Sequence, residues 1–175
     1  MENLTEYSMN KSIDTLSEEI DELLLRKLEL IEEKIRETIQ MEWLLKDGYI
    51  ELAKAKYICG KENIGILQVP SNTDTMISLF NLETKIMNEN DDTRSCFDIS
   101  LKNFNNEVNK PADPIKWFGI LVPQNLKNSQ QRFQESVYHA IKIANIQMQL
   151  VSVFSKLQKL YIQKNNLLCQ NGLTS

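Results

Sequence analysis

Apolar residues recur every three or four positions along two long stretches of this chain, and that recurrence limits the fold more than any other feature. Such spacing is typical of one face of an α-helix. Each stretch, residues 12–59 and residues 123–169, therefore predicts one helix, about 70 Å long at a rise of about 1.5 Å per residue. The recurring positions of the first are Ile13, Leu16, Ile20, Leu24, Leu28, Ile31, Ile35 and Ile39. Those of the second are Leu126, Phe133, Val137, Ala140, Ala144, Met148, Val151, Phe154, Leu157, Tyr161 and Leu168.

Local residues indicate where these helices begin and end. Ser12 is the expected N-cap of the first helix, after a flexible N-terminus over residues 1–11, and Gly60 is its expected C-terminal cap. Pro123 suits the first turn of the second helix, where a missing N–H costs nothing. Gly48 lies inside the first helix and is expected to weaken it by about 1 kcal/mol relative to alanine.

The matched lengths of the two helices predict that they fold back on each other. Residues 12–59 carry twelve acidic and seven basic residues, a net charge of −5, whereas residues 124–169 carry six basic residues and one acidic residue, a net charge of +5. Opposite charges favour pairing and set its direction, although two solvated faces would show the same composition. We therefore expect a mainly all-α fold: a long antiparallel two-helix coiled-coil hairpin with an irregular middle segment, partly β or disordered.

The connecting segment, residues 60–122, has a mixed pattern. Residues 63–69 and 76–82 are short apolar runs, which fit either strands or a packed loop. Residues 88–95 and 105–112 are polar, so the stretch 88–112 is expected to be mobile, and residues 170–175 form a short tail.

The second helix carries more apolar residues than a two-helix seam needs. A seam buries only a narrow stripe, so the additional residues must contact either the connecting segment or the helices of another protein. We therefore expect an obligate protein partner. The additional residues are Ile141, Ile143, Ile146, Leu150 and Val153.

Composition excludes several classes of protein. No stretch reaches the roughly 20 apolar residues of a membrane span, and the N-terminus lacks a signal-peptide pattern, so a location on the cytosolic side is expected. The chain has three cysteines. Their odd number and wide spacing indicate reduced thiols and no disulfide framework. A net charge of −4 argues against nucleic acid as a partner.

The residues that usually carry catalysis are sparse here. His139 is the single histidine, and no potential metal ligand lies one helical turn from it, so an ordinary position on the helix surface or in the seam is expected. Acidic pairs such as Glu18–Glu19 and Glu32–Glu33 are expected to be solvated. Phosphate-binding and nucleophile motifs are missing from the sequence. We therefore predict no enzyme activity, no metal, no cofactor and no small-molecule substrate.

Two segments are distinctive beyond their periodicity. They are GYIELAKAKYICGKENIGILQ, residues 48–68, and DPIKWFGILVPQNLKNSQQRF, residues 113–133. In this order, joined by a polar linker, they resemble the coiled-coil assembly-factor family of the vacuolar-type proton ATPase. The DP-x-x-WFG-x-LVP block carries most of the resemblance, because helical periodicity alone rarely places Trp, Phe, Gly and Pro in that order.

The resemblance implies a specific role. Members of that family are assembly chaperones, neither enzymes nor subunits of the finished pump. They act at the cytosolic face of the endoplasmic reticulum, where a two-span membrane partner holds them, and the ER–Golgi intermediate compartment, endosome and lysosome are further expected locations. They help the membrane-embedded, proton-conducting sector to assemble, and so support acidification of endosomes, lysosomes or vacuoles. The implied partners are thus the membrane-anchored assembly factor and subunits of the membrane sector.

The resemblance also points to site residues at the end where the two helices connect. Two roles remain open for them: contact with the partner, or internal packing of Trp117 and Phe118 onto Ala53 and Tyr57 that closes the hairpin. Gly119 would supply the turn before the second helix in either case. The full set is Trp117, Phe118, Gly119, Leu121 and Pro123, together with Leu52, Ala53, Ala55 and Tyr57.

Two other classes of protein fit the same helical pattern. A prefoldin-like co-chaperone subunit combines two helices with a small β segment, for which residues 63–69 and 76–82 are candidates. A generic coiled-coil scaffold would need a longer uninterrupted heptad pattern and no WFG block. Association with a membrane protein would distinguish the assembly factor from both.

Overall fold

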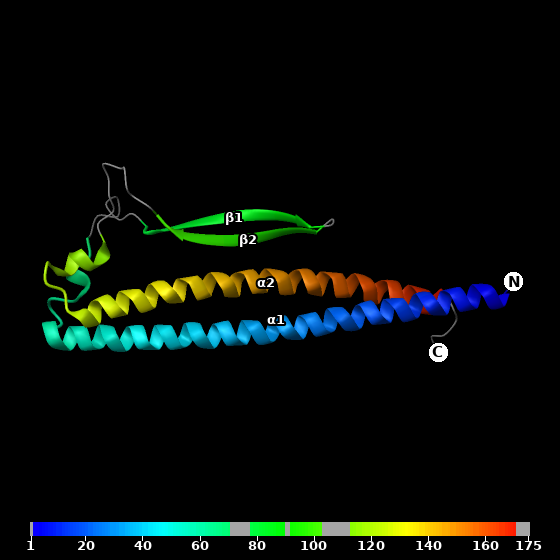
Figure 1. Cartoon of the computed structure of the whole chain (residues 1–175), viewed down its shortest axis with the longest axis horizontal. Helices are drawn as coiled ribbons and strands as arrows, with labels where there is room; N and C mark the ends of the chain where they lie inside the picture. Colours follow the sequence, from blue (N-terminus) through cyan, green and yellow to red (C-terminus); the bar gives the residue numbers. More distant parts are fainter. Residues whose placement is uncertain (1, 71–77, 90–91, 103–112, 171–175) are drawn as a thin grey trace. The chain divides into compact units, whose positions relative to one another are not determined.

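Two long helices and a two-stranded sheet make up the computed structural model, which describes residues 2–70, 78–89, 92–102 and 113–170 (Figure 1). The elements follow one another in a helix–strand–strand–helix order, with a short 3-10 helix after α1 and another before α2. Their bounds are α1 (Glu2–Cys59), η1 (Ile66–Gln68), β1 (Phe80–Glu89), β2 (Asp92–Leu101), η3 (Pro114–Phe118) and α2 (Gln124–Gln170). The predicted fold class is confirmed: the chain is mostly helical, its long helices pack together, and its sheet is small and antiparallel.

The chain divides into two compact units, each of which contains a segment of both long helices. Unit 1 comprises Met1–Ile35, Met87–Arg94 and Ile146–Ser175. Unit 2 comprises Arg36–Ile86 and Ser95–Asn145. In the described part of the chain, no helix has the length and apolarity to cross a membrane.

In unit 1 the helices meet along an apolar seam. Lys34 Nζ donates to Gln147 Oε1 across it at 2.6 Å, and Lys27 Nζ lies 5.9 Å from the ring centre of Phe154. Residue numbers rise along α1 as they fall along α2, so the helices run antiparallel here. The buried residues of the seam are Ile20, Leu30, Ile146, Val153 and Leu157, with Leu23, Leu24, Leu150 and Leu160 packed against them.

In unit 2 the helices approach each other around a glycine. Gly48 is buried, and a Cβ atom at this position would lie 3.1 Å from Cε1 of Phe133. Ser129 Oγ donates to the carbonyl oxygen of Gly48 at 2.8 Å, and Phe133 packs edge-on against Tyr49 with ring centres 5.1 Å apart. Gly48 therefore allows a close approach of the helices, whereas the sequence predicted only a weak point.

The face of α1 that packs on α2 differs from the predicted stripe. Leu28, Ile35 and Ile39 were expected to pack inward but are all more than half exposed. The packed face follows a 3.5-residue repeat that passes through charged residues and a glycine. The apolar stripe therefore shares Ile20 with it and diverges from it further along α1. Its members, all buried or half-buried, are Ile20, Leu23, Lys27, Leu30, Lys34, Glu37, Met41, Leu44, Gly48, Glu51 and Ala55.

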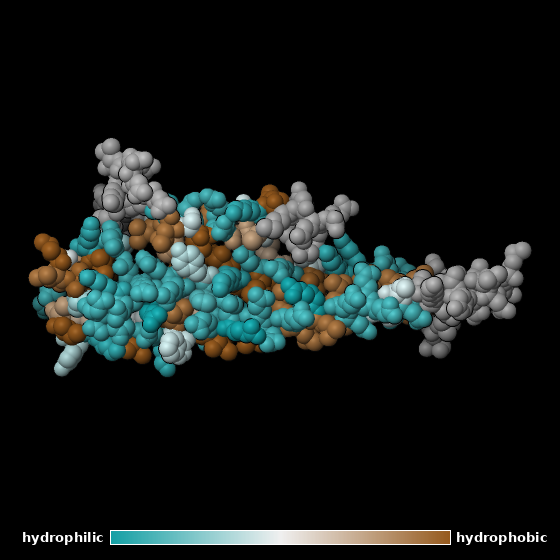
Figure 2. Space-filling model, viewed as in Figure 1, coloured by the Kyte–Doolittle hydropathy of each residue, from teal (hydrophilic) through white to brown (hydrophobic). Residues whose placement is uncertain are grey.

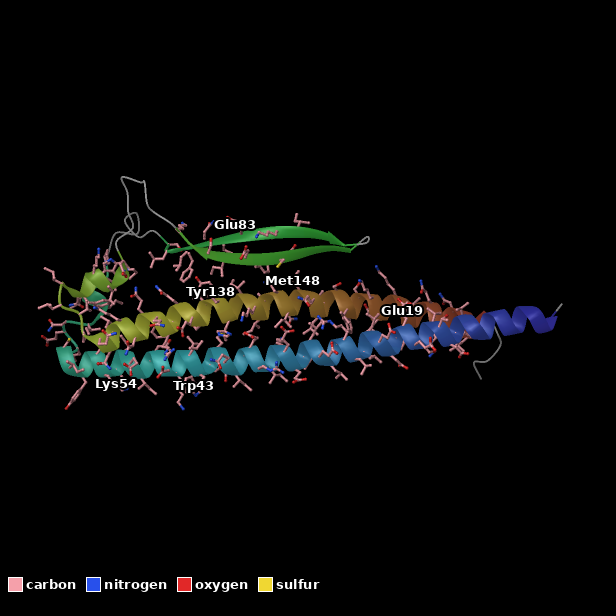
Figure 3. All side chains as sticks on the ribbon, in the orientation of Figure 1. Glu19, Trp43, Lys54, Glu83, Tyr138 and Met148 are labelled. Atoms are coloured by element: carbon pink, nitrogen blue, oxygen red, sulfur yellow. The ribbon has the colours of Figure 1, made fainter. Side chains whose placement is uncertain are left out.

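The predicted stripe of α2 also needs correction. Val151 and Phe154 are more than half exposed, while Ile146 and Val153, predicted to be additional to the seam, are buried in it. Among the described residues, exposed large apolar side chains are more numerous on α1 than on α2. Trp43 illustrates this, since it projects from α1 on the side opposite α2 (Figure 3).

The middle segment is more ordered than its polarity suggests. Residues 88–89 and 92–101, part of the stretch expected to be mobile, belong to β1 and β2, while residues 103–112 lie outside the described part of the chain. Strand residue Phe97 exchanges two hydrogen bonds with the side chain of Asn145 on α2: its N–H donates to Oδ1 at 2.8 Å and its carbonyl accepts from Nδ2 at 2.9 Å. Phe80 packs edge-on against Tyr138, with ring centres 5.7 Å apart.

The two apolar stretches of the connecting segment, expected to be strands or packed loop, have different outcomes. Residues 63–69 contain η1 and no strand, whereas residues 80–82 of the second stretch belong to β1. The helix boundaries lie near the expected ones at the connected ends, whereas α1 begins at Glu2, within the residues expected to be flexible.

Candidate functional site

The candidate site lies where α1 ends and α2 begins, an end of unit 2 that we call the closed end (Figure 1). Gly60 ends α1 with a φ of 84°, a left-handed conformation that glycine adopts without strain. Asn63 Nδ2 donates to the carbonyl oxygen of Cys59 at 2.7 Å and so satisfies one carbonyl of the last helical turn. The expected C-terminal cap is confirmed.

Trp117 and Phe118 of the WFG motif end η3, and a hydrogen-bonded aspartate before η3 connects it to α2. Asp113 Oδ1 accepts from the Ile115 N–H at 3.1 Å and from Gln130 Nε2 at 2.7 Å. Gly119 then has a φ of 107°, so a side chain at this position would be strained. The turn predicted at Gly119 is therefore present, and the N–H of Leu126 bonds to the carbonyl oxygen of Pro123 at 3.0 Å as α2 begins.

An apolar cluster, which we call the closed-end core, joins the three segments of this end. Ala55 of α1, Ile64 of the following loop and Leu126 of α2 are its buried members. Around them pack residues of α1 and of the motif: Leu52, Cys59, Ile115, Phe118 and Val122. Because every segment contributes an apolar side chain, the core fixes the loops against the helix ends.

Beside the closed-end core is a mainly apolar cavity of about 610 Å³. Leu52 of α1, Trp117 of η3 and Phe133 of α2 form three of its sides. Leu79 and Phe80, at the start of β1, contribute a fourth. A concave, mainly apolar space with a few polar groups is the usual form of a binding site for an apolar group.

Charged and polar side chains surround the junction of the two helices. Glu51 is buried and accepts hydrogen bonds from Lys54 Nζ at 2.5 Å and Asn125 Nδ2 at 2.6 Å. The hydrogen bond from Lys54, and then that from Asn125, lowers the pKa of the Glu51 carboxyl. Since Glu51 is on α1 and Asn125 in the first turn of α2, the carboxylate fixes how the helices align.

A second cluster of charges lies close by. Arg132 Nε donates to Asp47 Oδ2 at 2.8 Å, and Arg132 Nη1 donates to Glu135 Oε2 at 3.0 Å. These two carboxylates raise the pKa of the Arg132 guanidinium, Glu135 more than Asp47. Arg132 of α2 thus pairs with an acidic residue of α1, which is the kind of pairing that the opposite net charges of the two helices predicted.

The predicted site residues separate into two groups. Phe118 packs into the closed-end core with Leu52 and Ala55, and Trp117 is half-buried beside the cavity. The other predicted residues are Gly119, which forms the turn, half-buried Pro123, and exposed Ala53, Tyr57 and Leu121.

The sequence suggested that Trp117 and Phe118 pack onto Ala53 and Tyr57. In the structure Ala53 and Tyr57 are exposed, and Phe118 packs against the closed-end core instead. Successive residues of a helix point in directions about 100° apart, so Ala53 and Tyr57 share the opposite face of α1.

Several residues of this site escaped sequence reasoning. Gly48, Ser129, Glu51 and Asn125 are small or polar, and a search for apolar periodicity passes over them. The sequence does offer one signal for the close approach of the helices, which is Gly48 itself, because a glycine inside a helical pattern often has a packing reason.

His139 occupies the seam. Its Nδ1 lies 2.6 Å from Glu37 Oε2, and Lys142 Nζ lies 3.8 Å from the same oxygen. Among the described residues no group of histidine, cysteine and acidic side chains is arranged to hold a metal ion.

Comparison with known proteins finds a family model and several relatives that are similar to this sequence. Residues 81–136 match the model of the Vma22/CCDC115 family. The chain is 27% identical to a zebrafish protein over 178 aligned residues, 78% of this chain and 84% of that protein. It is 26% identical to a mouse protein over 157 residues, 79% and 87% of the two chains. A human protein is 27% identical over 150 residues, 75% and 83% of the two chains. This chain is similar to the Vma22/CCDC115 family.

All three relatives are named vacuolar ATPase assembly protein VMA22. The segment that the family model matches contains β1 from its second residue, β2, η3 and the first turns of α2. It therefore includes Trp117 and Phe118 and most of the cavity on the side of α2. The long seam of unit 1, which any coiled coil could form, lies mainly outside it.

Proposed function

We propose that this chain is a non-catalytic assembly chaperone for the membrane sector of the vacuolar-type proton ATPase. The observation that carries the proposal is its similarity, over 75–79% of its length, to three proteins named as vacuolar ATPase assembly proteins. The family match to residues 81–136 supports it further, because that segment holds the WFG motif and one side of the cavity.

The proposed partners are a membrane-anchored assembly factor and subunits of the membrane sector. Work at the cytosolic face of the endoplasmic reticulum would let the chain contact both before the pump leaves that membrane. In this way it would support acidification of endosomes, lysosomes or vacuoles. The apolar face of α1 that carries Ile39 and Trp43 is suited to pack against a helix of a partner.

At the site, we assign the packed and the open residues different roles. Phe118, Leu52 and Ala55 hold the closed end together through the closed-end core. Trp117 and Phe133 line the cavity, which is large enough for one or two apolar side chains of a partner. Inserting such an anchor into a desolvated pocket is how protein interfaces concentrate their binding energy.

A capture experiment with a filled cavity tests this role. Tagged protein is incubated with detergent-solubilised endoplasmic reticulum membranes, and bound proteins are identified by mass spectrometry. Val137, on the α2 side of the cavity, is replaced in the variant Val137→Trp. Ala140→Trp is the matched control, because Ala140 is exposed one turn further along the same helix.

We expect the wild-type chain and Ala140→Trp to recover membrane-sector subunits, and Val137→Trp to recover about tenfold less, since a single buried anchor contributes about 2 kcal/mol or more. Circular dichroism and melting confirm that both variants are folded. Failure of the wild-type chain to recover any such subunit would refute the proposed function. Equal recovery by both variants would refute only the role of the cavity.

A prefoldin-like subunit is the second candidate, and one observation favours it. The order α1, β1, β2, α2 places a β-hairpin between two long helices, the arrangement expected of such subunits. Recovery of nascent cytoskeletal proteins in the same experiment, with a hexameric mass for the purified complex, would favour this function over the first.

A further inference from the structure

Four aliphatic side chains at the closed end lie almost entirely in solvent. Ile66 and Leu67 of η1 are 86% and 88% exposed, and Ile120 and Leu121, just after Gly119, are 100% and 95% exposed. We call these four residues the apolar tip. Large aliphatic residues normally avoid such exposure in pairs, because each loses about 1.5–3 kcal/mol of burial free energy.

Packed neighbours hold the apolar tip in place. Ile64, two residues before Ile66, is buried in the closed-end core, and Val122, directly after Leu121, packs against that core. The two loops are thus fixed by one apolar residue each while the adjacent pair points outward. In Figure 2 apolar residues gather at this end, on the left of the view.

Two amphipathic aromatic residues accompany the apolar tip. Tyr57, in the last turns of α1, is 92% exposed, and Trp117 of η3 is half-buried three residues before Ile120. Tyrosine and tryptophan are the residues that concentrate at the boundary between lipid headgroups and acyl chains. Their apolar rings and polar groups suit an environment that is apolar on one side and aqueous on the other.

The charge around the apolar tip is positive, although the chain is acidic. Residues 52–69 carry three lysines and one acidic residue, and residues 113–127 carry two lysines and one acidic residue. With Glu51, the partner of Lys54, included, the closed end has a net charge of +2 in a chain with a net charge of −4. Lys54 is paired with Glu51, whereas Lys56, Lys61 and Lys116 are exposed beside the tip.

We propose that the apolar tip is a direct binding site for a lipid bilayer surface that carries anionic headgroups. Ile66, Leu67, Ile120 and Leu121 would enter the headgroup region, and the exposed lysines would contact lipid phosphate and carboxylate groups. Aliphatic residues at loop apices combined with a net positive charge, in which the lysines outnumber exposed Glu62, match that surface. The exposed face of α1 lacks this combination, because acidic Glu32 and Glu42 accompany its apolar residues.

Vesicle flotation with the purified full-length chain tests the proposal. One set of vesicles is phosphatidylcholine alone and the other contains about a quarter phosphatidylserine, a content that gives a negative surface. The tip variant is Ile120→Ser/Leu121→Ser, and Ile66→Ser/Leu67→Ser is a second, independent one. The control, Ile39→Gln/Trp43→Gln, alters residues of α1 that are 60% and 62% exposed.

We expect the wild-type chain to bind the anionic vesicles. Each tip variant should weaken this binding by about tenfold or more, and the control should leave it unchanged. Replacing Lys56, Lys61 and Lys116 with glutamine should weaken binding to the anionic vesicles by roughly fivefold per residue. Added salt should also weaken this binding. In the Trp43→Gln background Trp117 is the single tryptophan, so its emission should shift to shorter wavelength on binding.

Three results would overturn the proposal: no vesicle binding by the wild-type chain, equal binding by the wild-type and both tip variants, or binding lost only in the control. Loss of protein capture from solubilised membranes in a tip variant, without vesicle binding by the wild type, would assign the tip to a protein partner instead. The vesicles contain no protein, so failure here leaves the proposed assembly function untouched.

Discussion

At the scale of single residues, small and polar side chains decide how α1 and α2 align in unit 2. Gly48 removes the side chain that would keep the helices apart, and Ser129 bonds to its carbonyl oxygen. Glu51 adds a buried carboxylate that two side chains hold in place. Buried polar contacts of this kind select one alignment of two helices among several that apolar packing would allow.

Replacing Gly48 with alanine should lower the free energy of unfolding by about 1 kcal/mol, although alanine is the better helix former. The added Cβ would lie 3.1 Å from Phe133 Cε1, so the ring would have to move. Chemical denaturation of Gly48→Ala, of Phe133→Leu and of the double variant measures the coupling between them. A more stable Gly48→Ala in the wild-type background would contradict the close approach.

The Glu51 carboxylate should make stability depend on pH in the acid range. The pKa of Glu51 in the folded chain is below the ordinary value of 4.5. The carboxylate therefore contributes fully to the free energy of unfolding above pH 4.5, and this contribution is lost as the pH falls through the lowered pKa. Glu51→Gln should therefore be less stable than the wild type at neutral pH, and the difference should shrink on acidification. Denaturation curves at several pH values measure this, with Glu42→Gln, an exposed site on α1, as control. A difference that does not vary with pH would contradict the assignment.

At the scale of elements, α1 has apolar residues on two opposite faces, and only one of them packs on α2. Leu30 and Leu44 lie on the packed face, whereas Ile39 and Trp43 lie on the exposed one. An amphipathic helix normally has one apolar face, so the second face is available for a partner. Sequence periodicity could identify the helix correctly and still misplace its contact face.

Substitutions on the two faces of α1 should differ sharply in their effects on stability. Leu30→Ala removes a buried side chain and should cost about 2–5 kcal/mol. Ile39→Gln and Trp43→Gln should each change stability by no more than about 0.5 kcal/mol, because both side chains are largely exposed. Urea denaturation of the purified chain provides the comparison. Unfolding of the Ile39→Gln/Trp43→Gln variant under native conditions would show that the predicted stripe is the true contact face.

At the scale of the whole molecule, each compact unit contributes a different property. Unit 1 contains a mainly apolar helical seam. Unit 2 contains the close approach at Gly48, the closed-end core, the cavity and the apolar tip. The features to which we assign function are therefore concentrated in unit 2, where polar side chains join the helices and the closed-end core holds the loops.

The sequence by itself determined that two long helices exist, that the first ends near Gly60 and the second begins near Pro123, and that the chain resembles the vacuolar ATPase assembly-factor family. These properties depend on local spacing and on a rare order of residues around Trp117, both of which are present in the linear chain. Only the tertiary structure decided which face of α1 is buried, that Phe118 packs against the closed-end core, and that residues 88–89 and 92–101 belong to strands. These depend on which side chains meet across the fold, because a helix with two apolar faces has no local signal that selects one of them.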